Sequence, residues 1–138
     1  MLRREARKEV LKALYGSEFV KSRVDLGGEL LAEDPGEQED FIQEVYEGTL
    51  DHREEIDELI SSFTVGWKVE RLAVLDRNIL RMAIYEMLYS EETPAAVVMN
   101  EAIELAKEYG TDQAPKFING ILDRIWKESE SPEEDVKN

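Results

Sequence analysis

Apolar residues recur at every third or fourth position along most of this 138-residue chain, and this spacing limits the fold more than any other feature. Such a period places them on one face of an α-helix, whereas a half-buried strand needs strict alternation, which no run here sustains. The sequence therefore predicts an all-α protein, a compact helical bundle of about six to seven helices. A chain of this length can bury a core of its own as a single domain.

Glycine and proline separate the predicted helices. The helices are expected over about 2–19, 37–63, 71–89, 94–109 and 114–127, with a connector over 25–40 that could hold a further short helix. Thr93 is expected to cap a helix that starts with Pro94. Gly48 is expected to mark a bend, Trp67 to be a packed plug, and Gly120 to mark a close contact between helices.

A single domain over 1–128 is predicted, with an N-terminal half over 1–66 and a C-terminal half over 67–128. The last residues, 129–138, are acidic and poor in apolar side chains, which predicts a flexible tail. The chain has no cysteine, no apolar run long enough to span a membrane, and no apolar signal core near its start. These features favour a protein of the reducing cytoplasm.

The charge of the chain is unevenly placed. The net charge is -15, yet residues 1–24 hold seven Lys/Arg against three Asp/Glu. Arg4, Lys8 and Lys12 recur at every fourth position, so they share one helix face, with Tyr15 among them and Arg7 at its edge. Basic side chains supply affinity for phosphate, and aromatic rings stack on unpaired bases. This face is a candidate nucleic-acid site, and the alternative is an ordinary solvated surface.

No catalytic or metal-binding motif accompanies this face. The only histidine, His52, lies in a charged stretch and has no Glu-x-x-His partner pattern, and there is neither a phosphate-binding loop nor a dinucleotide fingerprint. We therefore predict no catalytic residues, no metal site and no cofactor. The chain is expected to be a binding protein rather than an enzyme.

Four blocks of the sequence resemble the NusB family of transcription antitermination factors, in the order and spacing of that family. The blocks are Ala6-Arg7 with Ala13-Leu14-Tyr15, LDRNILRMAIYE from Leu75 to Glu86, PAAVVMNEAIELAKEYG from Pro94 to Gly110, and KFINGIL from Lys116 to Leu122. The segment from Ser17 to Gly66 matches only in its helical character. The second, third and fourth blocks together make the resemblance specific.

The resemblance implies an all-α fold of two small helical subdomains without enzymatic activity. It implies binding to ribosomal protein S10 and, with S10, to boxA-type single-stranded RNA, in a complex that helps RNA polymerase resist termination, chiefly on ribosomal RNA operons. Together with the basic face, it gives these candidate RNA-binding residues: Arg3, Arg4, Arg7, Lys8, Lys12, Tyr15, Tyr109, Lys116 and Phe117. The interface with S10 is expected on the acidic helix around Asp76, Arg77 and Glu86.

Other interpretations remain open from the sequence. The strong negative charge favours a protein–protein adaptor without direct RNA binding, and salt dependence of RNA affinity would separate the two. Arg77 and Arg81 could hold salt bridges between helices, and Phe117 could lie in the core. A homodimer that hides the RNA face is a further alternative. The resemblance also extends to the fused domain of an rRNA cytosine methyltransferase, an alternative disfavoured because no cofactor-binding domain follows.

Overall fold

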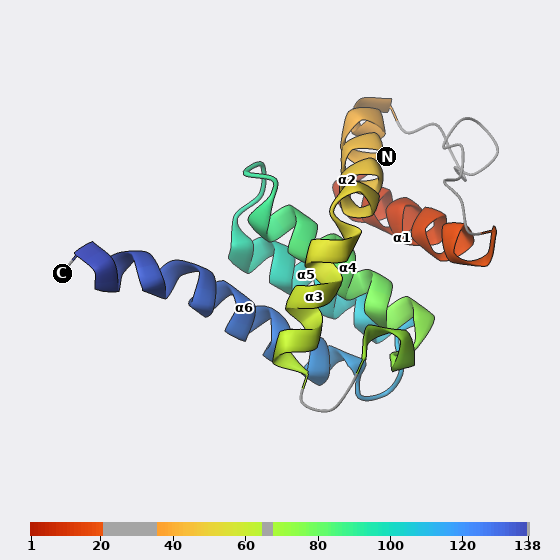
Figure 1. The fold of residues 1–138 in the computed structure, drawn as a ribbon. Coiled ribbons are helices and arrows are strands. Elements are labelled where there is room, and N and C mark those ends of the chain that lie inside the picture. The colour runs from red at the N-terminus through yellow and green to blue at the C-terminus, as the bar shows by residue number, and fades with distance from the viewer. Residues whose placement is uncertain (21–35, 65–67, 138) are drawn as a thin grey trace.

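The computed structural model describes residues 1–20, 36–64 and 68–137, and within these ranges it contains helices and no strand (Figure 1). The elements are α1 (Arg3–Val20), η2 (Gly36–Gln38), α2 (Glu39–Asp51), α3 (Arg53–Phe63), η3 (Val69–Arg71), α4 (Val74–Leu88), α5 (Ala95–Tyr109) and α6 (Ala114–Lys137), where η marks a short 3₁₀ helix. The predicted all-α fold is confirmed. Most of the predicted connector, up to residue 35, and the predicted plug at Trp67 lie outside the described residues.

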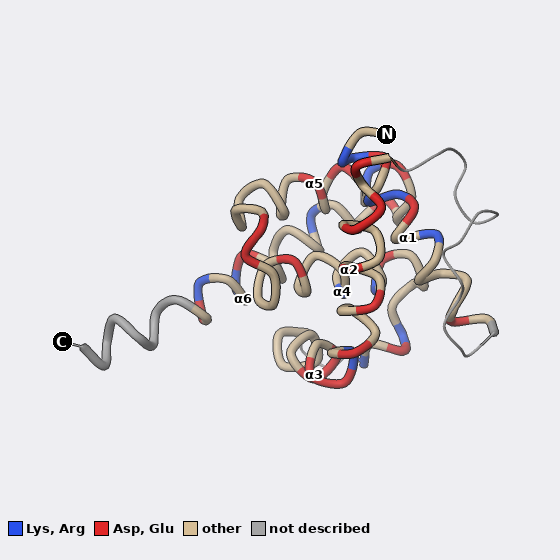
Figure 2. The backbone as a smooth tube through the Cα atoms, turned by 90° about the horizontal axis from the view of Figure 1, so that it is seen from above, with Lys and Arg blue, Asp and Glu red and all other residues tan. Residues whose placement is uncertain are grey.

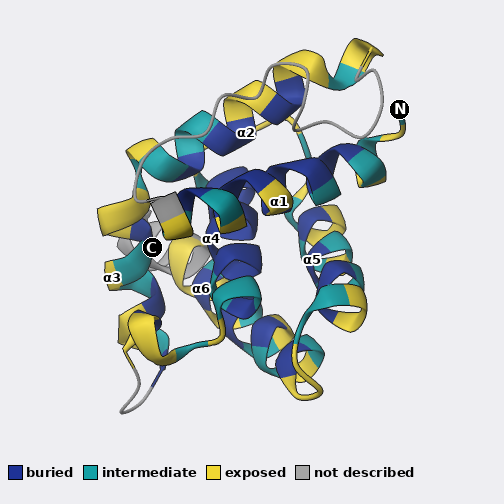
Figure 3. Cartoon of the chain, turned by 90° about the vertical axis from the view of Figure 1, so that its right-hand side faces the viewer, coloured by how far each residue is buried: buried dark blue, intermediate teal, exposed yellow. Residues whose placement is uncertain are grey.

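Helix α4 lies at the centre of the protein and contacts α1, α2, α3, α5 and α6. Eleven of its 15 residues are buried, so it is enclosed around most of its circumference (Figure 3). One hydrophobic cluster joins the buried side chains of α1 and α2 to those of α4, α5 and α6. The two predicted halves therefore share a core, and the boundary between them stays a prediction.

Helix α1 places one face in this core. Ala6, Val10 and Leu14 are buried as their spacing predicts, and Leu11 is buried beside them. Leu2 was expected on the same face but is 73% exposed. It precedes the first residue of the helix, so it does not share the orientation of the buried positions.

The predicted helix over 37–63 is in fact two helices that meet at His52. The His52 backbone (φ -106°, ψ 16°) departs from helical geometry, although its N–H still donates to the Gly48 carbonyl at 3.1 Å. The break therefore lies at His52 and not at Gly48, where a bend was expected. Gly48 has a packing role, because a Cβ atom there would lie 2.2 Å from Cζ of Tyr85.

Helix α5 begins at Ala95, one residue later than predicted, and ends before Gly110 as predicted. Gly120 in α6 was expected at a close helix contact, but a Cβ atom there would meet nothing within 4 Å. That prediction was wrong, because α6 packs through the buried residues Ile118, Ile121 and Leu122 instead.

Helix α6 continues to Lys137, beyond the predicted end near residue 127. Its C-terminal turns extend away from the other helices, on the side of the molecule opposite to α1 (Figure 1). The flexibility expected of residues 129–138 stays a prediction. The functional candidates lie elsewhere, where α1 meets α4 and α5.

Candidate nucleic-acid interface

The outer face of α1 carries the predicted basic stripe. The side chains of Arg4 and Lys12 are about half exposed, and that of Lys8 is 21% exposed. Tyr15 is 41% exposed and Phe19 is 63% exposed, with their ring centroids 4.7 Å apart. Large exposed rings beside cations are suited to unpaired bases and their phosphates. Phe19 was not among the predicted site residues, although its i+4 spacing from Tyr15 was visible in the sequence.

A groove of about 170 Å³ lies beside this stripe, where α1 meets α4 and α5. Its apolar walls include Leu11 and Leu75, and two tyrosines face it from different helices. The groove is lined by Lys8, Leu11, Lys12, Tyr15, Leu75 and Tyr109. Four of these six were predicted site residues, so the structure brings Tyr109 to the basic face as expected. An apolar slot with aromatic walls and ammonium groups at its edge can take a planar base.

A second groove of about 470 Å³ contains Phe117. Asp76 and Thr111 line it, and the neighbouring residues Leu75 and Tyr109 line the first groove, so the two grooves adjoin. Phe117 is only partly buried against the core, and the preceding residue, Lys116, is exposed. The second predicted cluster is therefore next to the first.

The basic face is paired with carboxylates, which the sequence analysis did not anticipate. Arg4 donates two hydrogen bonds to Glu101, at 3.0 and 2.7 Å, and Lys8 lies 3.2 Å from Glu108. The hydrogen bond to Glu101 raises the pKa of Arg4, and the hydrogen bond to Glu108 raises the pKa of Lys8. Figure 2 shows acidic positions interspersed with the basic positions of α1. The field of this face is thus much weaker than its count of cations suggests.

Two further cations of α1, Lys12 and Arg3, also have partners within the protein. Lys12 lies 3.1 Å from Oε2 of Glu9 on its own helix. Arg3 donates to Oε1 of Gln38 at 2.6 Å, and its guanidinium lies 4.0 Å from the ring centroid of Phe41. Arg3 therefore bridges α1 to α2, away from the groove lined by Tyr15 and Tyr109.

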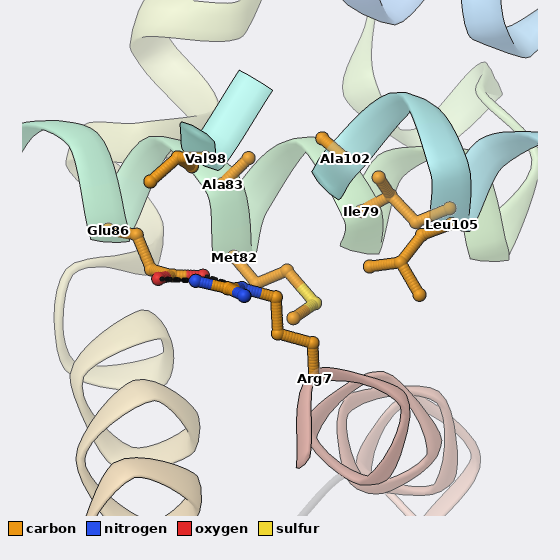
Figure 4. Close-up of a pocket in the computed structure, with 8 residues that line it drawn as sticks. All are labelled: Arg7, Ile79, Met82, Ala83, Glu86, Val98, Ala102 and Leu105. Atoms are coloured by element: carbon orange, nitrogen blue, oxygen red, sulfur yellow. Dashed lines mark hydrogen bonds and ion pairs between the residues drawn. The ribbon is translucent and has the colours of Figure 1, made fainter. Parts of the chain in front are cut away.

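Arg7 does not belong to the surface at all. It donates from Nε and Nη2 to the two carboxylate oxygens of Glu86, each at 2.9 Å. The side chains of Arg7 and Glu86 are 5% and 3% exposed, and Figure 4 shows them among Met82, Ile79 and Leu105. The cavity they line holds only about 10 Å³. The predicted surface roles of Arg7 and Glu86 are corrected to that of an internal ion pair.

The other two residues predicted to meet a protein partner are engaged internally as well. Asp76 is buried and accepts hydrogen bonds from the backbone N–H of Thr111 at 3.1 Å and from its hydroxyl at 2.8 Å. Arg77 donates to both carboxylate oxygens of Glu18, at 3.0 and 2.5 Å. Asp76 and Glu86 are therefore buried and do not form the acidic surface that was expected there. The alternative role for Arg77, a salt bridge between helices, is the one that the structure shows.

Glu18 is the centre of a network whose arginines, Arg77 and Arg81, were considered for salt bridges between helices, but whose carboxylates were not predicted. It accepts hydrogen bonds from Arg77, from Asn78 at 2.5 Å and from Arg81 at 3.0 Å, and Arg81 also forms a two-bond pair with Asp57. Burial disfavours the charged form of Glu18, but the hydrogen bonds and the charges of both arginines outweigh it and lower its pKa to about 2. This network ties the end of α1 to α3 and α4.

The described residues contain no cluster of His, Cys, Asp or Glu side chains that could hold a metal ion. Within the same ranges, no helix combines the length and the apolar character that a membrane span requires.

Comparisons with known proteins agree with this picture. The model of the NusB family matches residues 4–127. The transcription antitermination protein NusB of Bacillus subtilis (strain 168) is 45% identical over 125 residues, covering 91% of this chain and 95% of that protein. The NusB protein of Carboxydothermus hydrogenoformans is 40% identical over 144 residues, covering 94% of this chain and all of that protein.

Two solved structures are similar over most of their length. The structure of T. maritima NusB has a TM-score of 0.81 and 39% identity, covering 100% of this chain and 99% of that one. A crystal structure of the antitermination factors NusB and NusE in complex with double-stranded RNA has a TM-score of 0.72 and 26% identity, covering 91% and 96%.

Proposed function

We propose that this chain, which belongs to the NusB family, is a transcription antitermination factor. It binds boxA-type RNA together with ribosomal protein S10, the NusE of the similar solved complex, and helps RNA polymerase resist termination, chiefly on ribosomal RNA operons. The observation that supports this most directly is the groove that Tyr15 and Tyr109 line together with Lys8 and Lys12. The role is one of binding rather than catalysis, and it is carried out in the cytoplasm, where transcription takes place.

The RNA contact is assigned to the two adjoining grooves. Lys8 and Lys12 hold backbone phosphates at the edge of the first groove, and Arg4 extends this line along α1. Tyr15 and Tyr109 stack on an unpaired base. In the second groove, Phe117 offers a further ring and Lys116 a further cation.

Arg3 and Arg7 have a different role in this proposal. Arg7 is engaged inside the protein with Glu86, and Arg3 is held at the protein surface by Gln38 and Phe41. They orient α1 so that Lys8 and Tyr15 face outward. Because Asp76, Arg77 and Glu86 are occupied by internal contacts, we assign the S10 interface to no residue among them.

The adaptor interpretation is the second candidate, and the paired basic face favours it. If carboxylates of the protein satisfy every described cation of α1, RNA contact could come from S10 alone. This interpretation predicts that the protein binds S10 but adds no salt-dependent affinity for RNA. The strong negative charge of the chain, -15, would then favour the binding of a protein partner with a basic surface.

A fluorescence titration of labelled boxA-type RNA tests the proposal. It is run with this protein alone, with S10 alone and with both, at two salt concentrations, and a duplex of the same sequence serves as a control. We expect the mixture to bind the single strand more tightly than S10 does, with an affinity that falls steeply as salt rises. A mixture that binds no better than S10 alone would contradict RNA binding and support the adaptor.

A further inference from the structure

We infer that Glu108 occupies the position of an RNA phosphate at Lys8 and so lowers the affinity of the basic face for RNA. This inference rests on the proposed RNA binding of the α1 face. It assigns to one carboxylate of α5 a role as an intramolecular competitor. Neither the charge pattern of α1 nor the sequence around Glu108 indicates it, because the two residues meet only through the packing of α1 beside α5.

The geometry of Glu108 is that of a bound anion. Its Oε1 lies 3.2 Å from Nζ of Lys8, which is also 3.4 Å from Oε1 of Glu5. Glu108 additionally accepts a hydrogen bond from Tyr109, and this bond and the bond from Lys8 lower its pKa, so it stays ionised. Lys8 and Tyr109 both line the first groove. A phosphate oxygen at the same place would find the same two donors.

Glu108 is also free to leave. Its side chain is 48% exposed, and an ion pair at the surface contributes little to stability because solvent screens it. An RNA phosphate can therefore displace it at small cost. While it stays, however, it neutralises Lys8 and repels phosphates that approach the groove between Tyr15 and Tyr109.

Glu101, about two turns earlier on α5, does not share this role. Its side chain is 14% exposed, it binds Arg4 through both oxygens, and it lies 3.9 Å from Nη1 of Arg7. Arg7 also pairs with the buried carboxylate of Glu86, so Glu101, Arg7 and Glu86 form one network. Glu101 thus connects α5 to α1, and RNA cannot displace it without separating the two helices at this point.

The test is Glu108→Gln in the full-length protein, with Glu58→Gln as the matched control. Glu58 is exposed on α3, and its substitution removes the same charge at a distance from α1. Affinity for labelled boxA-type RNA is measured by fluorescence anisotropy, with S10 present, across a salt series. We expect Glu108→Gln to bind about three- to tenfold more tightly at low salt, and its salt dependence to differ in that this gain shrinks as salt screens the repulsion between Glu108 and phosphate. Glu58→Gln should change neither by comparable amounts.

A double-mutant cycle with Lys8→Gln locates the effect. If Glu108 acts through Lys8, the gain disappears in the Lys8→Gln background. A gain that persists there, or an equal gain in Glu58→Gln, would overturn the inference in favour of a general charge effect. An unchanged or lower affinity of Glu108→Gln would overturn it as well. Failure of the proposed function is distinct, because the unmodified protein would then add nothing to RNA binding by S10.

Discussion

Arg7 of α1 and Glu86 of α4 form a two-bond ion pair inside the protein, with both nitrogen–oxygen distances at 2.9 Å. Both side chains are almost fully shielded from water, at 5% and 3% exposure. A buried charge without its partner is costly, whereas the intact pair adds little net stability over apolar residues of the same shape. The pair therefore fixes how α1 docks rather than how tightly the core is held.

We predict that Arg7→Ala and Glu86→Ala each lower the free energy of unfolding by about 3–5 kcal/mol, because each leaves an uncompensated buried charge. The double variant Arg7→Met with Glu86→Leu should cost much less than the sum of the two single changes. Urea unfolding followed by circular dichroism measures all three. Single variants that unfold like the unmodified protein would show that the pair is hydrated in solution.

Two helical glycines should respond to alanine with opposite signs. Gly48→Ala places a Cβ atom 2.2 Å from the ring of Tyr85, and we expect it to destabilise the protein by about 1–3 kcal/mol through overpacking. Gly120→Ala meets no atom within 4 Å, and we expect it to stabilise α6 by up to about 1 kcal/mol through helix propensity. Thermal unfolding of the two variants side by side provides the comparison. Equal shifts of the same sign would contradict the packing described for Tyr85.

Stability below pH 5 should depend on Glu18. Its pKa is lowered from 4.5 to about 2, so its contribution is complete above pH 4.5 and is lost as the pH falls toward 2. At 1.36 kcal/mol per pKa unit, and reduced by solvent screening, the contribution is on the order of 1–3 kcal/mol. We therefore expect the stability difference between the unmodified protein and Glu18→Gln to shrink steadily across that pH range. A difference that stays constant from pH 6 to pH 2.5 would mean that Glu18 titrates normally.

Tyr15 and Tyr89 form a matched pair for testing the RNA face, since each is 41% exposed but Tyr15 lies on α1 and Tyr89 directly follows α4. Loss of one stacking ring typically costs about 1–3 kcal/mol. We expect Tyr15→Ala to weaken binding of boxA-type RNA in the presence of S10 by about 5- to 150-fold. Tyr89→Ala, whose ring rests on His52 at a centroid distance of 4.0 Å, should leave the affinity unchanged. Equal losses would indicate that neither ring contacts RNA directly.

The sequence was sufficient for the features that depend on local spacing. The four-residue spacing of Arg4, Lys8 and Lys12 correctly predicted an outward stripe, because helical geometry alone puts them on one face. The same geometry could have identified Arg7 as internal, since Leu11 and Leu14 follow it at i+4 and i+7 and are buried. Arg7 was assigned to the surface because its side chain is basic.

Features that depend on tertiary packing were out of reach. Arg4 and its partner Glu101 are 97 residues apart in the chain, and no local pattern connects them. Likewise, Gly48 and Gly120 look alike in sequence, and only the position of Tyr85 decides which of them is packed closely. The neutralisation of the basic face was missed for this reason, because it is a property of how α5 lies beside α1.

The ion pair between Arg7 and Glu86 also bears on how the protein is made. Glu86 is synthesised 79 residues after Arg7, which at about 5–20 residues per second is a delay of roughly 4–16 s. For that interval the first helix has no buried carboxylate to receive its guanidinium, so it cannot settle into the core. The basic segment over residues 1–24 therefore leaves the RNA-rich ribosome before the acidic residues that later neutralise it have been made.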